Sequence, residues 1–367
     1  MSSRTYPLQD QKTADVASRP LVTFLLVAYN QAAHIEEAVA AGFAQTYGPL
    51  EIIVSDDCSS DGTYTIASRM ADQYRGPHRV TVRRNERNLG LIGHICAVMR
   101  EVRGDLIVVA AGDDISCPER VEKLVDAWNA TGRRSGSIFS RYKTIHPDGT
   151  ITSNRSTPRM TVSQLSDRST KLLEDVSVGA LGCTHAWTKD VFEVFGQIDP
   201  RVVHEDVTIP LRSLLIGNIV FIPDELVLYR LTPGSLSRLD FRGHRERMRK
   251  MARYWEGRLA NYEQFQKDAA TALQANRIDP GTIEWVQAFL KAKENVARRH
   301  VQFYTASALM RFGVLLRAWR DLPLSQRLKW LVIAAVPWSY GLQLRRETIR
   351  RNSRARRLMR WLRVDRS

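Results

Sequence analysis

Apolar runs alternate with amphipathic segments over the first third of the chain, and this alternation restricts the possible folds more than any other feature of the sequence. The expected strands are Leu21–Ala28, Glu51–Ser55, Arg79–Arg83 and Leu106–Ala110, of which the first and the last are continuous apolar runs. The segments between them space their apolar residues as helices do and comprise His34–Gln45, Thr63–Tyr74 and Leu91–Val102. Strands that alternate with helices pair in parallel through right-handed crossovers. The sequence therefore predicts an α/β fold with a mainly parallel sheet flanked by helices.

Polar residues follow three of these strands at the point where each strand ends. They are the pairs Tyr29-Asn30, Asp56-Asp57 and Asp113-Asp114. Ligands of parallel sheets bind at the carboxyl ends of the strands, so we expect all three pairs to line one crevice. Adjacent carboxylates repel each other, and a cation or a ligand hydroxyl is their natural partner. The alternative for Asp113-Asp114 is a polar turn ahead of a helix that begins near Pro118.

The same strand ends belong to a longer series of motifs. Between Pro20 and Leu124 the chain reads VTFLLVAYN, EIIVSDDCSSDGT, NERNLG, GDLIVVAAGDD and PERVEKL, in that order. In order and spacing this series resembles the nucleotide-sugar-binding half of the family 2 glycosyltransferases, and a fainter likeness continues to about Ser237. The resemblance implies a GT-A fold, a nucleotide-sugar donor and an inverting reaction.

The resemblance also implies roles for the strand-end residues. Val27 and Tyr29 would pack on the base of the nucleotide, and Asp57 would contact that base. Asn30 and Asp56 would belong to the same donor site. Asp113 would face the ribose, and Asp114 would hold a divalent metal ion, Mn²⁺ or Mg²⁺. Such an ion neutralises the charge that develops on the departing diphosphate.

On the acceptor side we expect a hairpin at Ser137–Ile145 and Gly149–Thr152, a helix or loop at Thr161–Val176, and a strand at Gly182–Trp187. His185 on that strand is a candidate acceptor contact, although a histidine on a half-buried strand can equally be a hydrogen-bonded structural residue.

His204-Glu205-Asp206 precedes a helical run, Val207–Leu215, and His204 is placed on the acceptor side. By the resemblance Asp206 is the catalytic base, with Glu205 as the other candidate, because inversion needs a carboxylate that takes the proton of the acceptor hydroxyl. Two adjacent acids at a helix start can also simply stabilise the helix.

The segment Leu226–Ser237 resembles the family segment that closes over the donor. Arg230 is a candidate diphosphate contact, or a surface strand residue. Thr232 stands where the family has a histidine.

The last third of the chain differs in charge and pattern. Residues 1–237 contain 25 basic and 28 acidic side chains, and residues 238–367 contain 29 and 11, so we place a domain boundary near Ser237. We expect helices at Gly243–Gln274, Thr282–Arg317, Ser325–Leu344 and Arg345–Arg363. The least charged stretch, Trp330–Leu344, is shorter than the roughly 20 residues of a spanning helix.

Aromatic residues in that stretch stand next to an arginine cluster, which favours attachment to an anionic membrane surface. The alternatives are a helical bundle with a solvated basic face and a nucleic-acid-binding region. We expect no nucleic acid, because no such module is recognisable and the acidic crevice would repel phosphates.

The resulting organisation is a tail at residues 1–19, a GT-A domain at 20–237 and a basic helical region at 238–367. Within the GT-A domain, 20–130 would bind the donor and 131–237 the acceptor. The first twenty residues have no apolar core of an export signal, and the four cysteines are far apart, so we expect a cytoplasmic protein that is peripheral on the inner face of the plasma membrane.

The predicted activity is transfer of a sugar, by preference from a UDP-sugar, to a hydroxyl of a saccharide or lipid-linked acceptor in cell-surface polysaccharide or glycolipid synthesis. Two alternatives remain: a nucleotidyltransferase with a similar sheet, and a non-catalytic protein that binds sugar nucleotides or nucleic acid.

Overall fold

The computed structural model describes residues 4–5, 19–153, 162–163, 181–203, 205–232, 244–278, 280–319, 324, 326–327 and 330. Contacts divide the chain into two compact units. The first comprises Met1–Ser235 together with Glu263–Ala288, and the second comprises Leu236–Tyr262 together with Phe289–Ser367. The sheet unit thus includes a helical segment that the sequence placed in the C-terminal region.

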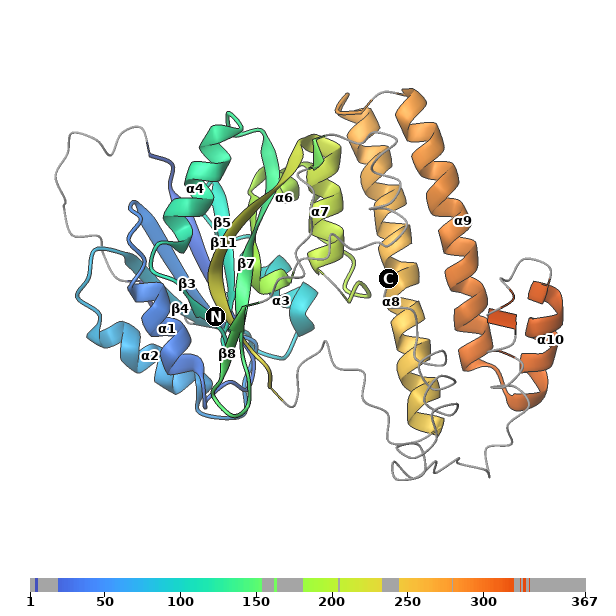
Figure 1. Cartoon of the computed structure of the whole chain (residues 1–367), viewed down its shortest axis with the longest axis horizontal. Helices are drawn as coiled ribbons and strands as arrows, with labels where there is room; N and C mark the ends of the chain where they lie inside the picture. Colours follow the sequence, from blue (N-terminus) through green and yellow to red (C-terminus); the bar gives the residue numbers. More distant parts are fainter. Residues whose placement is uncertain are drawn as a thin grey trace. The chain divides into compact units, whose positions relative to one another are not determined.

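An 11-stranded sheet forms the centre of the first unit (Figure 1). Its strands are β1 (Arg4–Thr5), β2 (Val22–Ala28), β3 (Leu50–Asp56), β4 (Arg79–Arg84), β5 (Leu106–Ala111), β6 (Ile115–Ser116), β7 (Ser135–Ile145), β8 (Ile151–Ser153), β9 (Val162–Ser163), β10 (His185–Thr188) and β11 (Asn218–Arg230). The order is β1-β4-β3-β2-β5-β10-β7-β11-β6, with β8 paired to β7 and β9 to β11.

Strands β4, β3, β2 and β5 are parallel neighbours, as the sequence predicts. The sheet becomes mixed at β10, which runs antiparallel to both β5 and β7. The expected hairpin is also present, because β8 pairs antiparallel with the end of β7. Of the expected helix or loop at Thr161–Val176, only β9 lies among the described residues.

The helices of the first unit are α1 (Ile35–Phe43), α2 (Thr63–Gln73), α3 (Gly90–Val98), α4 (Arg120–Ala130), α6 (Asp190–Phe195) and α7 (Glu205–Ile216), with the 3₁₀ turn η3 (Gly182–Thr184). Helices α8 (His244–Gln274), α9 (Pro280–Thr305) and α10 (Ala308–Ala318) follow. The single helix expected at Thr282–Arg317 is wrong: α9 ends at Thr305, and the side chain of Ser307 in extended conformation accepts the amide of Met310 and starts α10.

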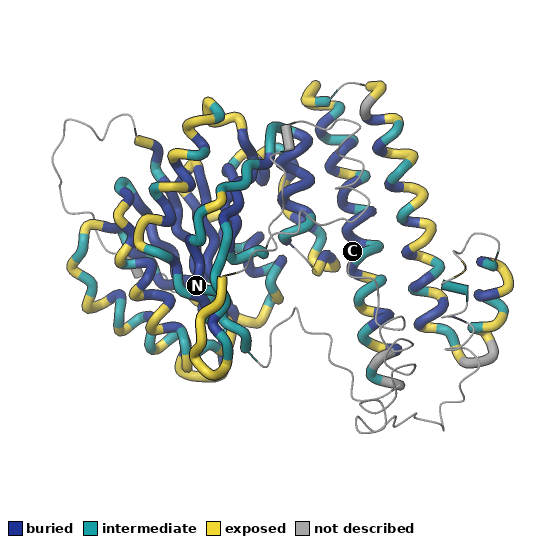
Figure 2. The backbone as a smooth tube through the Cα atoms, viewed as in Figure 1, coloured by how far each residue is buried: buried dark blue, intermediate teal, exposed yellow. Residues whose placement is uncertain are grey.

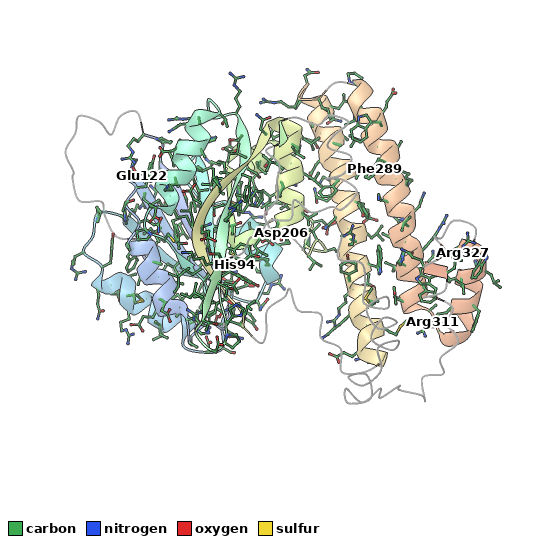
Figure 3. All side chains as sticks on the ribbon, viewed as in Figure 1. His94, Glu122, Asp206, Phe289, Arg311 and Arg327 are labelled. Carbon is green, nitrogen blue, oxygen red and sulfur yellow. The ribbon has the colours of Figure 1, made fainter. Side chains whose placement is uncertain are left out.

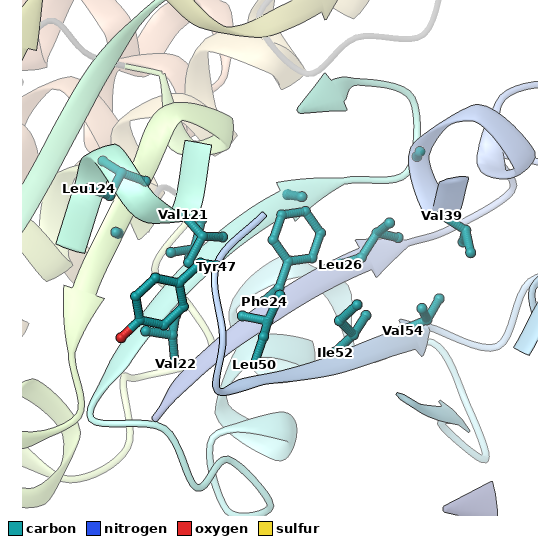
Figure 4. Packing of buried hydrophobic residues seen from close by; sticks show 14 of the residues in the cluster. Val22, Phe24, Leu26, Val39, Tyr47, Leu50, Ile52, Val54, Val121 and Leu124 are labelled. Atoms are coloured by element: carbon teal, nitrogen blue, oxygen red, sulfur yellow. The ribbon is translucent and has the colours of Figure 1, made fainter. Parts of the chain in front are cut away.

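The core of the sheet unit explains why the strands read as continuous apolar runs. Every residue of β3 is buried, and the strands appear as the darkest part of this unit in Figure 2. Strands covered on both faces have no solvated side that would require alternation. Figure 4 shows one face of this core, formed by Val22, Phe24, Leu26, Leu50, Ile52 and Val54 of the strands with Val39, Tyr47, Val121 and Leu124.

The second unit has a small core of its own. It contains Met248, Met251, Ala252, Phe303, Tyr304, Leu315, Ala318 and Trp330. The rings of Phe303 and Trp330 stack at 4.1 Å, and Trp330 is only 1% exposed. The aromatic stretch expected at a membrane surface thus begins with a core residue, and the rest of that stretch lies outside the described residues. In the part of the chain that the structure describes, no helix is long and apolar enough to cross a membrane.

Candidate active site

The carboxyl ends of β2, β3 and β5 meet at one edge of the sheet. Beyond the last ladder pairs, the amide of Asp57 donates to the carbonyl of Ala28 at 2.9 Å, and the amide of Gly112 donates to that of Val27 at 2.9 Å. A Cβ atom on Gly112 would lie 2.8 Å from the Cβ of Ala28, so only glycine permits this approach. The three polar pairs therefore lie at a common edge.

The two acids after β3 are buried and held in place. Asp56 accepts the amide and the hydroxyl of Ser59 and pairs with Arg84 at 3.2 Å. Asp57 accepts from Asn85 Nδ2 at 2.7 Å and from the amide of Leu89 at 2.9 Å, both at Oδ1. Asp56 thus shapes the turn, and Asp57 presents a fixed carboxyl at the edge.

The end of β2 is fixed by the same turn. Asn30 has a positive φ of 53°, its amide donates to Ser59 Oγ at 2.8 Å, and its Oδ1 accepts the amide of Ser60 at 2.9 Å. Tyr29 beside it is 48% exposed, while Val27 is half-buried. An exposed aromatic ring on a rigid strand end is suited to stacking on a planar ligand group.

Arg230 at the end of β11 fastens the turn that carries Asp113 and Asp114. Its amide donates to Asp114 Oδ1 at 2.8 Å, its Nε to the carbonyl of Asp113 at 3.0 Å, and its Nη2 to Glu37 of α1 at 2.9 Å. The guanidinium is thus engaged with backbone and Glu37, so its main role in this structure is to fix the turn. Thr232, just beyond, hydrogen-bonds the carboxyl of Asp113. The residue at the position of the expected histidine is therefore a partner of Asp113.

Asp114 is a buried carboxyl that could bind a cation. It is 4% exposed, and its Oδ2 has no hydrogen-bond partner among the described residues. Burial and the nearby charge of Asp113 raise the pKa of Asp114 to about 7. The Arg230 amide and the Cys183 thiol both hydrogen-bond this carboxyl, but they do not offset its burial, so it resists ionisation until a cation reaches it.

These two acids fit a hard divalent cation. Among the described residues no three His, Cys, Asp or Glu side chains form a metal site. Mg²⁺-type ions, however, are commonly held by one or two carboxylates together with substrate phosphates and water. The free Oδ2 of Asp114, with Asp113 next to it, matches that partial ligand set.

A second acid pair begins α7. Asp206 is labelled there in Figure 3. Glu205 is buried, and burial together with the charge of Asp206 raises the pKa of Glu205 to about 8. At neutral pH one of the two adjacent acids therefore keeps its proton, and the pair titrates as a unit.

The turn η3 joins the two acid pairs. A Cβ on Gly182 would lie 2.0 Å from Glu205 Oε1 and 3.9 Å from the Cβ of Asp206. The next residue, Cys183, has a buried thiol whose pKa is raised well above its usual value by burial and by the charge of Asp114. Asp114 after β5 and Glu205 at the start of α7 thus contact adjacent residues of one short turn.

Comparison with known proteins identifies the family. Residues 23–190 match the profile described as "Glycosyl transferase family 2". Residues 23–190 are thus a family 2 glycosyltransferase domain. The "Succinoglycan biosynthesis protein ExoO" of Rhizobium meliloti is 34% identical over 31% of this chain and 31% of its own length. The "Putative glycosyltransferase EpsE" of Bacillus subtilis is 33% identical over 29% of this chain and 38% of its own length. The match thus spans about a third of each of these relatives.

Solved structures extend the likeness of fold beyond the family 2 match. The crystal structure of S. aureus TarS 1–349 in complex with UDP-GlcNAc has a TM-score of 0.55 at 14% identity, and the similarity covers 86% of this chain and 88% of that one. The structure without UDP-GlcNAc gives a TM-score of 0.52. The predicted GT-A-type fold of the glycosyltransferase domain is confirmed.

His185 does not lie at the common edge of the polar strand ends. Its side chain is fully buried, its Nε2 shares a hydrogen with Ser137 Oγ at 2.7 Å, and its ring stacks on Phe139 at 4.0 Å. Burial lowers its pKa well below the usual value, so the ring is neutral. We therefore replace the predicted acceptor contact by a structural role, because β10 lies in the interior of the sheet. His204, the other predicted acceptor residue, lies outside the described residues.

The sequence analysis missed Arg120 in the glycosyltransferase domain. Its fully buried guanidinium donates to Ser116 Oγ at 2.8 Å, to the carbonyl of Val109 at 2.8 Å and to that of Cys183 at 2.7 Å. It therefore links β5, β6 and η3, and its positive charge acts on Asp114. Its position on the first turn of a helix gave no sign of this, since charged residues there are commonly solvated.

Proposed function

We propose that the chain is an inverting glycosyltransferase that transfers one sugar from a nucleotide sugar to an acceptor hydroxyl. The observation that supports this most directly is the turn η3, where Gly182 adjoins Glu205 and Asp206 while Cys183 adjoins Asp114. Inverting transfer needs a group that stabilises the departing diphosphate and a base for the acceptor hydroxyl. Two acid pairs on one turn meet that requirement.

The donor would bind at the common strand edge. Tyr29 would stack on the base, and the fixed carboxyl of Asp57 would accept hydrogen bonds from it. Asp113 would accept from the ribose. We propose UDP as the nucleotide; UDP-GlcNAc, which TarS 1–349 binds, is the first donor to test.

Asp114, with Asp113, would hold Mn²⁺ or Mg²⁺ through its free Oδ2. When bound, the ion supplies positive charge to the departing diphosphate. Asp206 would accept the proton of the acceptor hydroxyl. Glu205, protonated at neutral pH, would leave the negative charge of the pair on Asp206, because its pKa is raised to about 8.

For the acceptor we propose a saccharide or a lipid-linked saccharide of a cell-surface polysaccharide. The support is the relative named for succinoglycan biosynthesis, although the matched segment is only part of that protein.

We further propose that the enzyme lies on an anionic membrane surface on the cytoplasmic side. Residues 238–367 hold 29 basic and 11 acidic side chains. On α10 the large apolar side chains Met310, Phe312 and Leu316 are exposed near Arg317. Apolar and basic side chains on one helix suit an interfacial position, with about 1 kcal/mol from each basic residue near an anionic surface. Co-sedimentation of the full chain with liposomes should rise with anionic lipid content and fall in Phe312→Ser/Leu316→Ser; binding indifferent to lipid charge contradicts this part.

The activity test is incubation with UDP-GlcNAc and a panel of other nucleotide sugars, with Mn²⁺ and a saccharide acceptor. Release of the nucleoside diphosphate and inverted anomeric configuration in the product, read by NMR, are expected. Retained configuration contradicts the proposed mechanism. Release of pyrophosphate from a nucleoside triphosphate would indicate a nucleotidyltransferase, and tight binding without turnover would indicate a binding protein.

A further inference from the structure

A buried ion pair ties α7 to the C-terminal half of α8. Arg212 donates from Nε to Asp268 Oδ2 at 2.8 Å and from Nη2 to Oδ1 at 3.1 Å. The two side chains are 0% and 1% exposed. Gln264, one turn earlier on α8, donates to Asp268 Oδ1 at 2.8 Å. The pair is thus bidentate and supported by a further buried hydrogen bond.

The same groups hold the loop that leads into α7. Arg212 Nη1 donates to the carbonyl of Gly196 at 2.8 Å, and Nη2 lies 3.4 Å from that of Gln197. The amide of Asp199 donates to Gln264 Oε1 at 2.9 Å. From α3, the sulfur of Cys96 accepts the amide of Ile198 at 3.4 Å. Residues 196–199 are therefore fastened from three helices just before the acid pair Glu205-Asp206.

The buried ion pair orients loop 196–199 as well as filling space, because apolar side chains of the same volume would fill that space without hydrogen-bonding the loop. A buried ion pair is often no more stabilising than apolar residues of equal volume. Its bidentate geometry, however, fixes direction. Here the orientation of the Arg212 guanidinium fixes the positions of the loop carbonyls and of α7. Arg212 lies on α7 fewer than two turns after Asp206.

We propose that Gln264 and Asp268 of α8 are positioning residues for the reaction: through Arg212 and loop 196–199 they hold the N-terminal end of α7, and with it Asp206 and Glu205, against η3. This inference rests on the proposed function of the acid pair. It assigns part of the active-site architecture to a helix that lies beyond the family match at residues 23–190.

The test uses the full chain and two variants. Asp268→Asn keeps the shape and removes the charge. Arg212→Met/Asp268→Leu removes the ion pair without leaving a buried charge, so it should remain folded. With UDP-GlcNAc and Mn²⁺ as probe, both variants should lose about 10²-fold in kcat, the scale of a displacement near 1 Å, while KM for the donor stays within about twofold.

The control for stability is Val80→Ala in β4, which removes buried volume far along the sheet from α7. If Val80→Ala, assayed at an equal distance below its own Tm, loses as much kcat as Asp268→Asn, or if the double variant keeps wild-type kcat, the proposal is overturned.

A readout independent of turnover separates this inference from the proposed function. Amide hydrogen exchange in residues 196–208 should become about tenfold faster in the double variant, with β2 and β3 unchanged. Wild-type exchange rates in that segment would overturn the positioning role. Absence of turnover in the wild-type chain, with faster exchange in the variant, would instead count against the proposed function alone.

Discussion

Replacing Glu205 by glutamine should remove a pH-dependent cost of folding. The pKa of this carboxyl is raised from 4.5 to about 8 by burial and by the charge of Asp206. Between these values the unfolded chain has lost the proton while the folded protein keeps it. The contribution of Glu205 to the free energy of unfolding is therefore fully present below pH 4.5 and is lost as pH rises through about 8. The amide of glutamine has the same shape and no proton to lose.

The size of the effect follows from the shift. One pKa unit corresponds to about 1.4 kcal/mol, so the shift represents up to about 5 kcal/mol. If the Asp206 side chain moves away once both acids are ionised, the loss of stability is smaller. We therefore expect the stability difference between the two proteins to change by about 2 to 5 kcal/mol between pH 5 and pH 9.

The assay is chemical unfolding of the wild type and Glu205→Gln at pH values near 5, 7 and 9. The two proteins should be equally stable near pH 5, and the variant should be the more stable one near pH 9. Asp114 titrates in the same direction, with its pKa raised to about 7, but it is present in both proteins and cancels in the difference. Parallel stability curves over the whole range would refute the reasoning, because they would show that Glu205 is not the source of the pH dependence.

Three further predictions concern activity. Asp114→Asn should abolish turnover and remove the Tm increase that Mn²⁺ with UDP gives the wild type, measured by thermal shift; full wild-type activity in excess EDTA would count against the metal. Asp206→Asn should bind UDP-GlcNAc normally yet lose about 10²–10⁴-fold in rate, more than Glu205→Gln, and the reverse ranking would move the base to Glu205. Gly182→Ala would bring a Cβ to 2.0 Å from Glu205 Oε1 and should lower kcat with UDP binding retained. The control Gly313→Ala, whose Cβ would meet only Arg317 at 3.7 Å, should have wild-type activity. Equal activity of these two variants would argue against η3 as the link between the acid pairs.

Local patterns were sufficient for the donor half of the fold. Leu21–Ala28 and Leu106–Ala110 are apolar runs of the kind that a strand covered on both faces requires, and the structure has β2 and β5 there. Because parallel strands point the same way, the common edge of Asn30, Asp57 and Asp114 followed from strand direction alone. The family assignment followed from the order and spacing of the same motifs.

The limits of sequence reasoning lie where long-range contacts decide burial. His185 has the local context of a half-buried strand, yet β10 inserts between β5 and β7, so neighbours on both sides enclose the ring. The break between α9 and α10 was missed because the apolar spacing continues through Ser307, while the cap that ends the pattern is a matter of backbone conformation.

The sequence by itself determined the strands of the donor half and their parallel direction, the polar strand ends and the split in charge between the two parts of the chain, because each depends on residues close in sequence. The tertiary structure alone decided which distant groups share an environment. Gly182 became part of the site by lying against Glu205, and Asp268 became the counterion of Arg212 across 56 residues. Desolvation and charge pairing act through space, so the raised pKa of Glu205 and the clamp on α7 exist only once the chain has folded.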